Sequence, residues 1–248
     1  MNTLAHIDTN RKAGTKQLAL LIDPDKLSDA QVLALVAEAK ECAVDLFFVG
    51  SSLLLSDRFE RCIELIKTNC DIPVVIFPGN NLQVSAKADA LLFLSLISGR
   101  NPDMLIGKHV IAAPHLKRAG LEVIPTGYML IESGTPTAVS YMSNTTPIPR
   151  DKNDIAICTA MAGELLGLRM IYMDAGSGAQ NPISLAMVKA VRASIDIPLI
   201  IGGGVRDSQK AAELCQAGAD VLVVGNVLEK DPSVLRSISD AVHQTKVL

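Results

Sequence analysis

The feature that most constrains the fold is a regular alternation of short apolar runs with longer segments of helical periodicity along the 248 residues. The short runs are almost continuously apolar, which is typical of strands buried on both faces of a parallel sheet. We predict eight strands, at Leu18–Asp23, Asp45–Val49, Pro73–Phe77, Asp89–Leu94, Leu121–Pro125, Arg169–Asp174, Pro198–Ile201 and Asp220–Val224.

Segments with a helical pattern lie between these strands. The first begins with SDAQ, where Ser28 followed three residues later by Gln31 is typical of a capping box. We predict helices at Ser28–Lys40, Asp57–Thr68, Asp103–His109, Asp154–Gly167, Ser184–Ser194, Ser208–Gly218 and Ser233–His243. Eight strands that alternate with helices predict an α/β fold, a (β/α)8 TIM barrel, as a single domain over residues 1–248.

Two connections depart from the regular pattern. The third and fourth predicted strands are separated by PGNNLQVSAKA, which is too short for two turns and a full helix. We therefore expect the third helix to be missing or reduced. The stretch Thr126–Arg150 is rich in Ser, Thr, Gly and Pro, so we predict a long loop there, and such loops are usually functional or disordered.

Composition argues against several classes of protein. A net charge of −3 does not suit a general nucleic-acid binder, which needs clustered cations. No apolar run approaches the roughly 20 residues that span a bilayer, and the N-terminal stretch lacks the apolar core of a secretion signal. The five cysteines form no CxxC pair and the four histidines show no zinc-site spacing. We expect a cytoplasmic protein without a transmembrane segment, a zinc site or disulfides.

Glycine-rich turns follow the last three predicted strands. They are Gly176-Ser177-Gly178, Gly202-Gly203-Gly204 and Gly225-Asn226. Glycine lets backbone N–H groups approach an anion, and the following helix adds its positive N-terminal end. Each turn alone is also typical of an ordinary tight turn. Three adjacent turns at the catalytic end of a barrel predict a phosphate site.

Asp174 ends the sixth predicted strand, directly before these glycines. A carboxylate repels phosphate, so we predict that Asp174 binds a hydroxyl of the same ligand or takes its proton. The alternative is a purely structural hydrogen bond. Tyr172 points the same way because strand side chains alternate, and its hydroxyl is predicted to contact substrate.

Oxygen ligands follow the first two strands. Asp23 and Asp25 stand at the first strand end, and Ser52 stands at the second. Hard oxygen ligands of this kind hold Mg²⁺, which usually keeps waters and adds substrate phosphate oxygens. The alternative is that Asp23-Pro24 only turns the chain and that Ser52 caps the next segment.

These groups imply a phosphorylated polyol and a second, metal-bound anion, but they do not name a reaction. The segments LLIDPDK, FFVGSS, EVIPTGY, YMDAGSG, IIGGGVR and VVGN, in this order, resemble the geranylgeranylglyceryl phosphate synthase family, the PcrB-like prenyltransferases. The resemblance runs from about residue 18 to residue 232. The expected absence of the third helix also resembles a feature of that family.

The resemblance implies a function in ether lipid, and hence phospholipid, biosynthesis. The family transfers a prenyl group, geranylgeranyl in this branch, from its diphosphate to the 3-hydroxyl of sn-glycerol 1-phosphate. By resemblance, Mg²⁺ binds Asp23 and Ser52, Asp174 and Tyr172 are catalytic, and the chain forms a homo-oligomer. The glycerol phosphate ligands implied in the same way are Tyr172, Met173, Asp174, Ala175, Gly176, Ser177, Gly178, Gly203, Gly204, Gly225 and Asn226.

Two positions depart from common family patterns. Asp174 stands where Glu is usual, and Leu21 stands where the heptaprenyl branch carries Lys. The chain therefore resembles the archaeal-type geranylgeranyl branch. A prenyl tail also needs an apolar groove, for which Phe77, Leu94 and Ile97 are candidates, with ordinary barrel core as the alternative.

Two rival functions remain open at this level. A phosphosugar isomerase or lyase shares the phosphate site of such barrels and needs an acid–base pair but no metal-bound diphosphate. A non-catalytic sensor of a phosphorylated ligand would bind without turnover.

Overall fold

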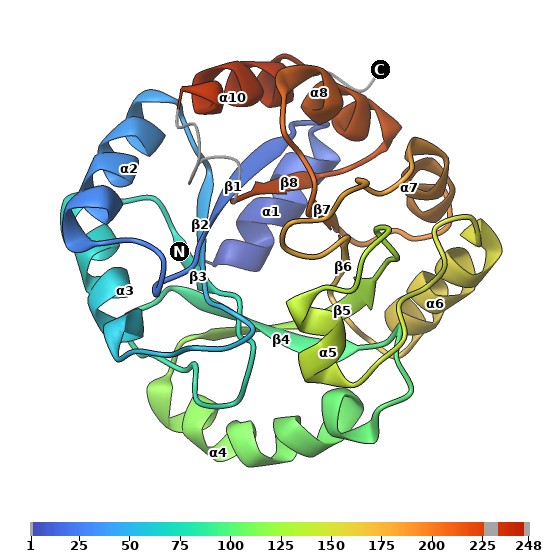
Figure 1. Cartoon of the computed structure of the whole chain (residues 1–248), viewed down its shortest axis with the longest axis horizontal. Helices are drawn as coiled ribbons and strands as arrows, with labels where there is room; N and C mark the ends of the chain where they lie inside the picture. The colour runs from blue at the N-terminus through green and yellow to red at the C-terminus, as the bar shows by residue number, and fades with distance from the viewer. Residues whose placement is uncertain (1, 226–232, 246–248) are drawn as a thin grey trace.

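The structure is a computed structural model that describes residues 2–225 and 233–245. Eight parallel strands form a closed barrel in chain order, with β1 paired to β8 (Figure 1). The strands are β1 (Gln17–Ile22), β2 (Leu46–Val49), β3 (Val74–Ile76), β4 (Ala90–Leu96), β5 (Glu122–Leu130), β6 (Met170–Asp174), β7 (Leu199–Gly202) and β8 (Val221–Val224). The predicted TIM barrel is confirmed.

Helices surround the barrel, as Figure 1 shows. They are α2 (Asp29–Glu41), α3 (Arg58–Asn69), the π-helical turn η1 (Asp103–Gly107), α4 (Lys108–Ala119), α6 (Asn153–Leu165), α7 (Leu185–Arg192), α8 (Ser208–Ala217) and α10 (Val234–Gln244). The short helix α5 (Ala138–Ser143) lies inside this ring and lines the cavity at the barrel mouth. The capping box at Ser28 and Gln31 is present. Residues 77–89, between β3 and β4, contain no helix, so the predicted loss of the third helix is confirmed.

Strand alternation divides the apolar core into two layers. One set of side chains fills the barrel interior and includes Leu46, Phe48, Leu92 and Tyr172. The other set points outward and packs under the helices, as Phe47 and Met173 do. Because β6 sends Tyr172 inward and Met173 outward, Asp174 faces the barrel axis at the open end.

The prediction of a long loop over Thr126–Arg150 is wrong at its start. Strand β5 continues to Leu130, because residues 126–128 pair with β4 and residues 126–130 pair with β6. Tyr128 and Leu130 thereby enter the barrel interior. The short helix α5 occupies part of the remaining stretch and begins at a capping box on Thr137. These residues are typical of turns by sequence, but they form a strand here because the neighbouring strands pair with them.

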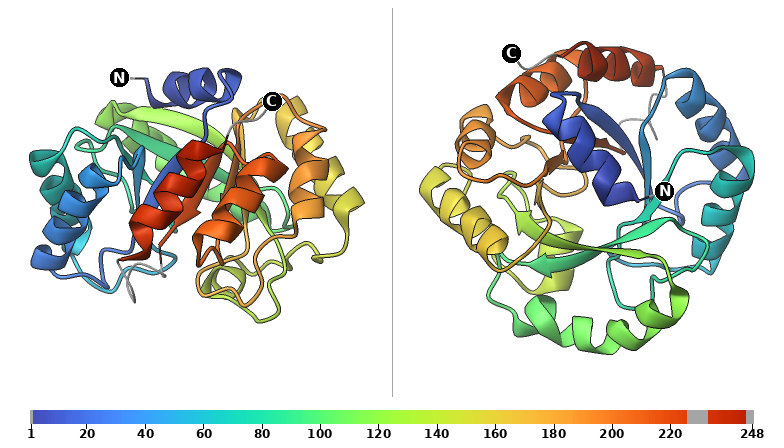
Figure 2. Two further views of the ribbon diagram at one scale, coloured as in Figure 1. Left: turned by 90° about the horizontal axis from the view of Figure 1, so that it is seen from above. Right: turned by 180° about the vertical axis from the view of Figure 1, so that it is seen from behind.

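Two helices also differ from the prediction. The sequence predicts one helix over Asp103–His109, yet α4 continues through Pro114 to Ala119. Helix α1 (Thr3–Lys12) was not predicted, since its sequence is largely polar. It lies across the end of the barrel opposite the open mouth (Figure 2). Its Ile7 packs against the interior layer, and Glu122 accepts hydrogen bonds from the backbone N–H groups of Thr3 and Leu4 at 2.6 and 3.1 Å.

None of the helices in residues 2–225 and 233–245 is long and apolar enough to cross a membrane.

Candidate active site

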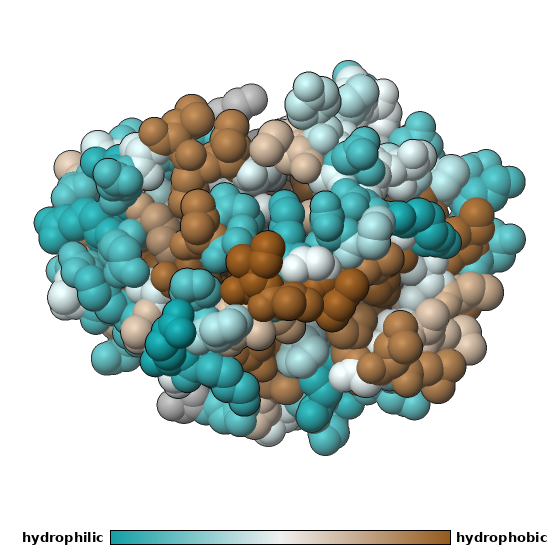
Figure 3. All heavy atoms as spheres, turned by 90° about the horizontal axis from the view of Figure 1, so that it is seen from below, coloured by the Kyte–Doolittle hydropathy of each residue, from teal (hydrophilic) through white to brown (hydrophobic). Residues whose placement is uncertain are grey.

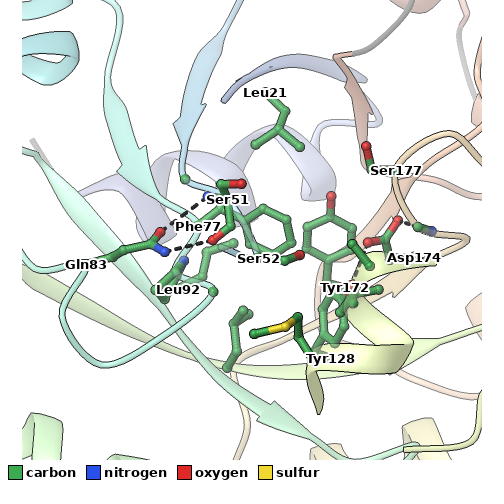
Figure 4. A pocket seen from close by; sticks show the side chains of 18 of the residues that line it. Leu21, Ser51, Ser52, Phe77, Gln83, Leu92, Tyr128, Tyr172, Asp174 and Ser177 are labelled. Atoms are coloured by element: carbon green, nitrogen blue, oxygen red, sulfur yellow. Dashed lines mark hydrogen bonds between the residues drawn. The ribbon is translucent and has the colours of Figure 1, made fainter. Parts of the chain in front are cut away.

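A cavity of about 750 Å³ opens at the C-terminal ends of the strands. Its wall changes in character around the barrel. Carboxylates, hydroxyls and glycines lie at the ends of β1, β2, β6, β7 and β8, whereas apolar side chains of β4 and α4 line the remaining part. Figure 4 shows Ser51 and Ser52 on one side of the cavity, Asp174 and Ser177 on the other, and aromatic rings between them.

Asp174 is held by two hydrogen bonds at the polar end of the cavity. The hydroxyl of Tyr128 donates to its Oδ2 at 2.5 Å, and the backbone N–H of Gly176 donates to its Oδ1 at 2.8 Å. The side chain is buried but lines the cavity. Each carboxylate oxygen can accept a further hydrogen bond, so Asp174 can also meet a ligand hydroxyl.

Burial raises the pKa of the Asp174 carboxyl above its ordinary value, although the hydrogen bonds from Tyr128 and Gly176 lower it in part. Burial and the neighbouring Asp174 charge raise the pKa of Tyr128 well above its ordinary value, so this phenol stays protonated and donates. A carboxylate with a raised pKa is a stronger base than one in water. Tyr128 was assigned to the loop by sequence, and its inward position follows from the extra length of β5.

Three aromatic rings form a wall beside Asp174. Phe77 stacks on Tyr172 with 5.0 Å between ring centroids, and Tyr128 meets Tyr172 edge-on at 5.5 Å. All three line the cavity. Tyr172 faces the cavity as predicted, whereas Phe77, a candidate for the prenyl groove, stacks on Tyr172 near the polar end. Tyr128 and Tyr172 belong to the layer of side chains that fills the barrel interior, and Phe77 packs against it.

The glycines of the predicted phosphate site come together at the polar end. Gly176, Ser177 and Gly178 after β6 line the cavity with Gly203, Gly204 and Gly225. Gly203 and Gly204 adopt left-handed backbone conformations, with φ of +79° and +77°. A Cβ atom on Gly203 would lie 2.9 Å from both Asp174 Oδ1 and the Gly176 nitrogen. Only glycine allows this approach between the β6 and β7 loops.

Three predicted ligands of the phosphorylated substrate need separate comment. The side chains of Met173 and Ala175 are buried in the outer core layer and point away from the cavity, because they alternate with Tyr172 and Asp174. Only their backbone groups can therefore face a ligand. Asn226 lies outside the described residues.

Arg206 is a cavity residue that the sequence reasoning missed. It follows the Gly202-Gly203-Gly204 turn, lines the cavity, and donates to the carbonyl of Ala179 at 2.8 Å. A guanidinium beside glycine turns suits a phosphate dianion. Its position two residues after the last glycine of this turn is the feature of the sequence that could have identified it.

The predicted metal residues Asp23 and Ser52 both line the opposite rim of the cavity. Asp23 Oδ2 accepts a hydrogen bond from Ser51 Oγ at 3.0 Å, and Lys26 Nζ lies 3.8 Å from the same oxygen. Asp25, the other candidate, points away and accepts hydrogen bonds from the Leu55 backbone and the Ser56 hydroxyl. It does not line the cavity.

This rim is stabilised by the loop that replaces the third helix. Gln83 is fully buried, donates to the Ser51 carbonyl at 2.7 Å and accepts from the Ser51 N–H at 3.3 Å. In residues 2–225 and 233–245 no three His, Cys, Asp or Glu side chains cluster as metal ligands. The oxygens of Asp23 and the neighbouring serines therefore fit Mg²⁺ as part of a coordination shell, in which water and a bound anion supply the remaining ligands.

The apolar part of the cavity runs beside β4 and under α4. It is lined by Leu91, Leu92, Phe93, Leu94, Leu96, Met104, Ala112 and Leu116. The missing third helix leaves room here, next to β3. Leu94 thus lies where predicted, but Ile97 does not: its Cδ1 lies beside Gly127 and Gly163, where it packs outside the barrel between β5 and α6.

Comparison with known proteins gives a consistent picture. The PcrB family model matches residues 11–245. A geranylgeranylglyceryl phosphate synthase from Chitinophaga pinensis is 55% identical over 235 residues, which cover 94% of this chain and 93% of that protein. The crystal structure of (S)-3-O-geranylgeranylglyceryl phosphate synthase from Thermoplasma acidophilum, in complex with its substrate sn-glycerol-1-phosphate, is similar with a TM-score of 0.92 and 31% identity, covering 98% and 99% of the two chains.

More distant structures share only the barrel. An N-acetylmannosamine-6-phosphate 2-epimerase from Clostridium perfringens has a TM-score of 0.59 at 11% identity, over 93% of this chain and 95% of that one. Such a likeness shows the fold alone.

Proposed function

Because the chain belongs to the PcrB family, we propose that it is a prenyltransferase that joins geranylgeranyl diphosphate to the 3-hydroxyl of sn-glycerol 1-phosphate. The observation that carries this proposal is one cavity with two ends of opposite character. A glycine-rich end with a buried carboxylate suits a phosphorylated polyol, and an apolar end under α4 suits a long hydrocarbon tail. The products are geranylgeranylglyceryl phosphate and diphosphate, which belong to ether lipid biosynthesis.

At the glycine-rich end, backbone N–H groups of the β6, β7 and β8 turns and the Arg206 guanidinium bind the phosphate. Tyr172 and Asp174 then face the glycerol hydroxyls. The 3-hydroxyl oxygen forms a bond to C1 of the prenyl group while the bond from C1 to the diphosphate oxygen breaks, and the hydroxyl proton moves to Asp174. Tyr128 and Gly176 hold the carboxylate in place for this transfer. A general base in such a position contributes about 10² to 10⁴ in rate.

At the apolar end, the tail lies along β4 and beneath α4. Each buried CH₂ group stabilises the bound tail by about 0.8 kcal/mol, so hydrocarbon binding can position C1 of the prenyl group against the 3-hydroxyl. Fixing both reactants in one cavity removes much of the entropic barrier.

We also propose that Mg²⁺ is the cofactor, held by Asp23 with Ser52 and the prenyl diphosphate. When bound, the ion supplies Lewis-acid stabilisation of the departing diphosphate, an effect of several kcal/mol. Lys26, near Asp23, adds a fixed positive charge at the same rim.

We further propose that the chain works in the cytoplasm as a homo-oligomer. All five cysteines are free thiols, which suits a reducing compartment. Helix α6 exposes Ile155, Met161 and Leu165, with Leu166 next to them, and such an apolar stripe suits contact between copies.

A transfer assay tests the function directly. Purified protein is incubated with sn-glycerol 1-phosphate, Mg²⁺ and prenyl diphosphates of increasing length, and the ether product is measured by mass spectrometry. We expect geranylgeranylglyceryl phosphate to form fastest. Absence of ether product with every donor, together with isomerisation or cleavage of a phosphosugar, would favour the isomerase or lyase alternative instead.

A further inference from the structure

Helix α4 and the turn η1 before it carry apolar side chains on two opposite faces. The inner face, with Ala112 and Leu116, is buried against the cavity. The outer face leaves Ile106, Val110 and Ile111 between 57% and 66% exposed. A helix that covers a barrel normally exposes polar side chains, so the outer face is unusual. Figure 3, which views the molecule from the α4 side, shows hydrophobic surface gathered across the middle of this face.

The same segment is cationic in an acidic protein. Residues 100–118 contain four cations, Arg100, Lys108, Lys117 and Arg118, and one acid, Asp103, whereas the whole chain has a net charge of −3. None of these four cations forms an ion pair with a carboxylate in the part of the chain that the structure describes. Lys108 lines the cavity and Arg100 donates to the Gly99 carbonyl at 2.8 Å, whereas Lys117 and Arg118 are exposed on α4. Exposed apolar side chains flanked by exposed cations are the composition that binds the interface of an anionic bilayer.

We propose that the outer face of η1 and α4 docks on an anionic lipid bilayer, so that the apolar end of the cavity opens next to the membrane. This inference rests on the proposed function, because the docking face matters only if the cavity takes a hydrocarbon tail. A donor with such a tail partitions into lipid, and the product is itself an anionic lipid. The helix that covers the apolar channel is then also the helix that contacts the source of the tail.

A second copy of the chain fits this face less well than lipid does. A two-fold contact would place the same patch against itself. That arrangement would bring the exposed Lys117 and Arg118 of both copies together and would therefore be repulsive, whereas an anionic surface neutralises these cations.

Vesicle sedimentation with the full-length protein tests the docking. Vesicles of phosphatidylcholine alone are compared with vesicles that also contain phosphatidylglycerol, at low and high salt. We expect binding that requires phosphatidylglycerol and weakens with salt. Equal binding to both vesicle types, or no binding at low salt, would overturn the proposal.

Variants locate the contact. Val110→Gln with Ile111→Gln should lower the vesicle partition coefficient by about tenfold or more, and the matched pair Val110→Leu with Ile111→Leu should retain it. Lys117→Gln should weaken binding to anionic vesicles, whereas Lys189→Gln on α7, an exposed cation on another helix, should not. Wild-type binding by the glutamine pair would overturn the assignment, as would a change of oligomeric state in that pair on size-exclusion chromatography without lipid.

A detergent assay separates this proposal from the proposed function. With detergent-dispersed geranylgeranyl diphosphate, the glutamine pair should turn over at the wild-type rate while its activity on vesicle-borne donor falls. If the wild-type protein binds anionic vesicles but makes no ether product in detergent, the proposed function is contradicted and only the lipid-binding surface is supported. If the wild-type protein is active in detergent and the glutamine pair equals the wild type on vesicle-borne donor, the docking proposal is overturned and the proposed function stands.

Discussion

The two sides of the barrel mouth are built in contrasting ways. On the side of β6, β7 and β8, short turns with left-handed glycines bring strand ends and backbone N–H groups close together. On the side of β3 and β4, one helix is absent, and a loop fixed by the buried Gln83 leaves an apolar channel beneath α4. The contrast teaches that one fold can bind both a compact anion and an extended hydrocarbon. The anion requires backbone N–H groups that approach closely, and the hydrocarbon requires the space that the absent helix leaves.

The largest expected effect comes from the rim that joins the two sides. Asp23→Asn, or excess chelator, should reduce turnover by about a thousandfold or more, since the Lewis-acid contribution is several kcal/mol. Binding of glycerol phosphate, measured by calorimetry, should persist because its site lies across the mouth. The neighbouring Asp25→Asn is the control and should keep most activity. Full turnover in chelator would contradict the magnesium proposal.

The next effect isolates the chemistry of the polar side. Asp174→Asn keeps the shape of the side chain but not its basicity, so kcat should fall by about 10² to 10⁴ while binding of glycerol phosphate changes less. Asp174→Glu should retain measurable activity. A rise in KM with an unchanged kcat would make Asp174 a binding residue and no base.

The glycine turns should respond to added side chains. Gly204→Val should raise the KM for glycerol phosphate by about ten- to a hundredfold, the worth of one or more hydrogen bonds to a charged group. The control is Gly167→Val, which has a similar left-handed backbone after α6 but open space around it. An equal KM in both folded variants would place the phosphate elsewhere.

The apolar side should respond to the volume under α4. Ala112→Phe should lower kcat/KM for geranylgeranyl diphosphate by about tenfold and affect shorter donors less, because the added ring displaces several buried CH₂ groups. Ala113→Phe places the same ring on the exposed side of the helix and should leave donor preference unchanged. If the two variants respond alike, the tail does not lie beneath α4.

An effect of similar size concerns Tyr128, which lies between the two sides. Tyr128→Phe removes the hydrogen bond that lowers the pKa of Asp174, while burial, which raises that pKa, remains. The acidic limb of the kcat profile should therefore move to higher pH, because protonated Asp174 cannot accept a proton, and kcat at neutral pH should fall by about tenfold. An unshifted acidic limb would show that Tyr128 does not position the base.

The sequence predicted the barrel and the polar side of its mouth well, for a local reason. Apolar runs, glycine turns and Asp174 each carry their signal within a few residues, and parallel strands bring their ends to one face. Tyr128 could not be found in this way, because its place in the interior depends on pairing of β5 with two other strands. Ile97 was misplaced for a similar reason: one residue decides which face of a strand end a side chain occupies.

The N-terminal helix has a consequence for the order in which the chain can complete its fold. Its first N–H groups bond to Glu122, which is 119 and 118 positions further along than Thr3 and Leu4. A helix of ten residues has little stability alone. During synthesis, α1 therefore has no partner until Glu122 has been added, and the β8 edge of β1 stays unpaired until Val221–Val224 have been added.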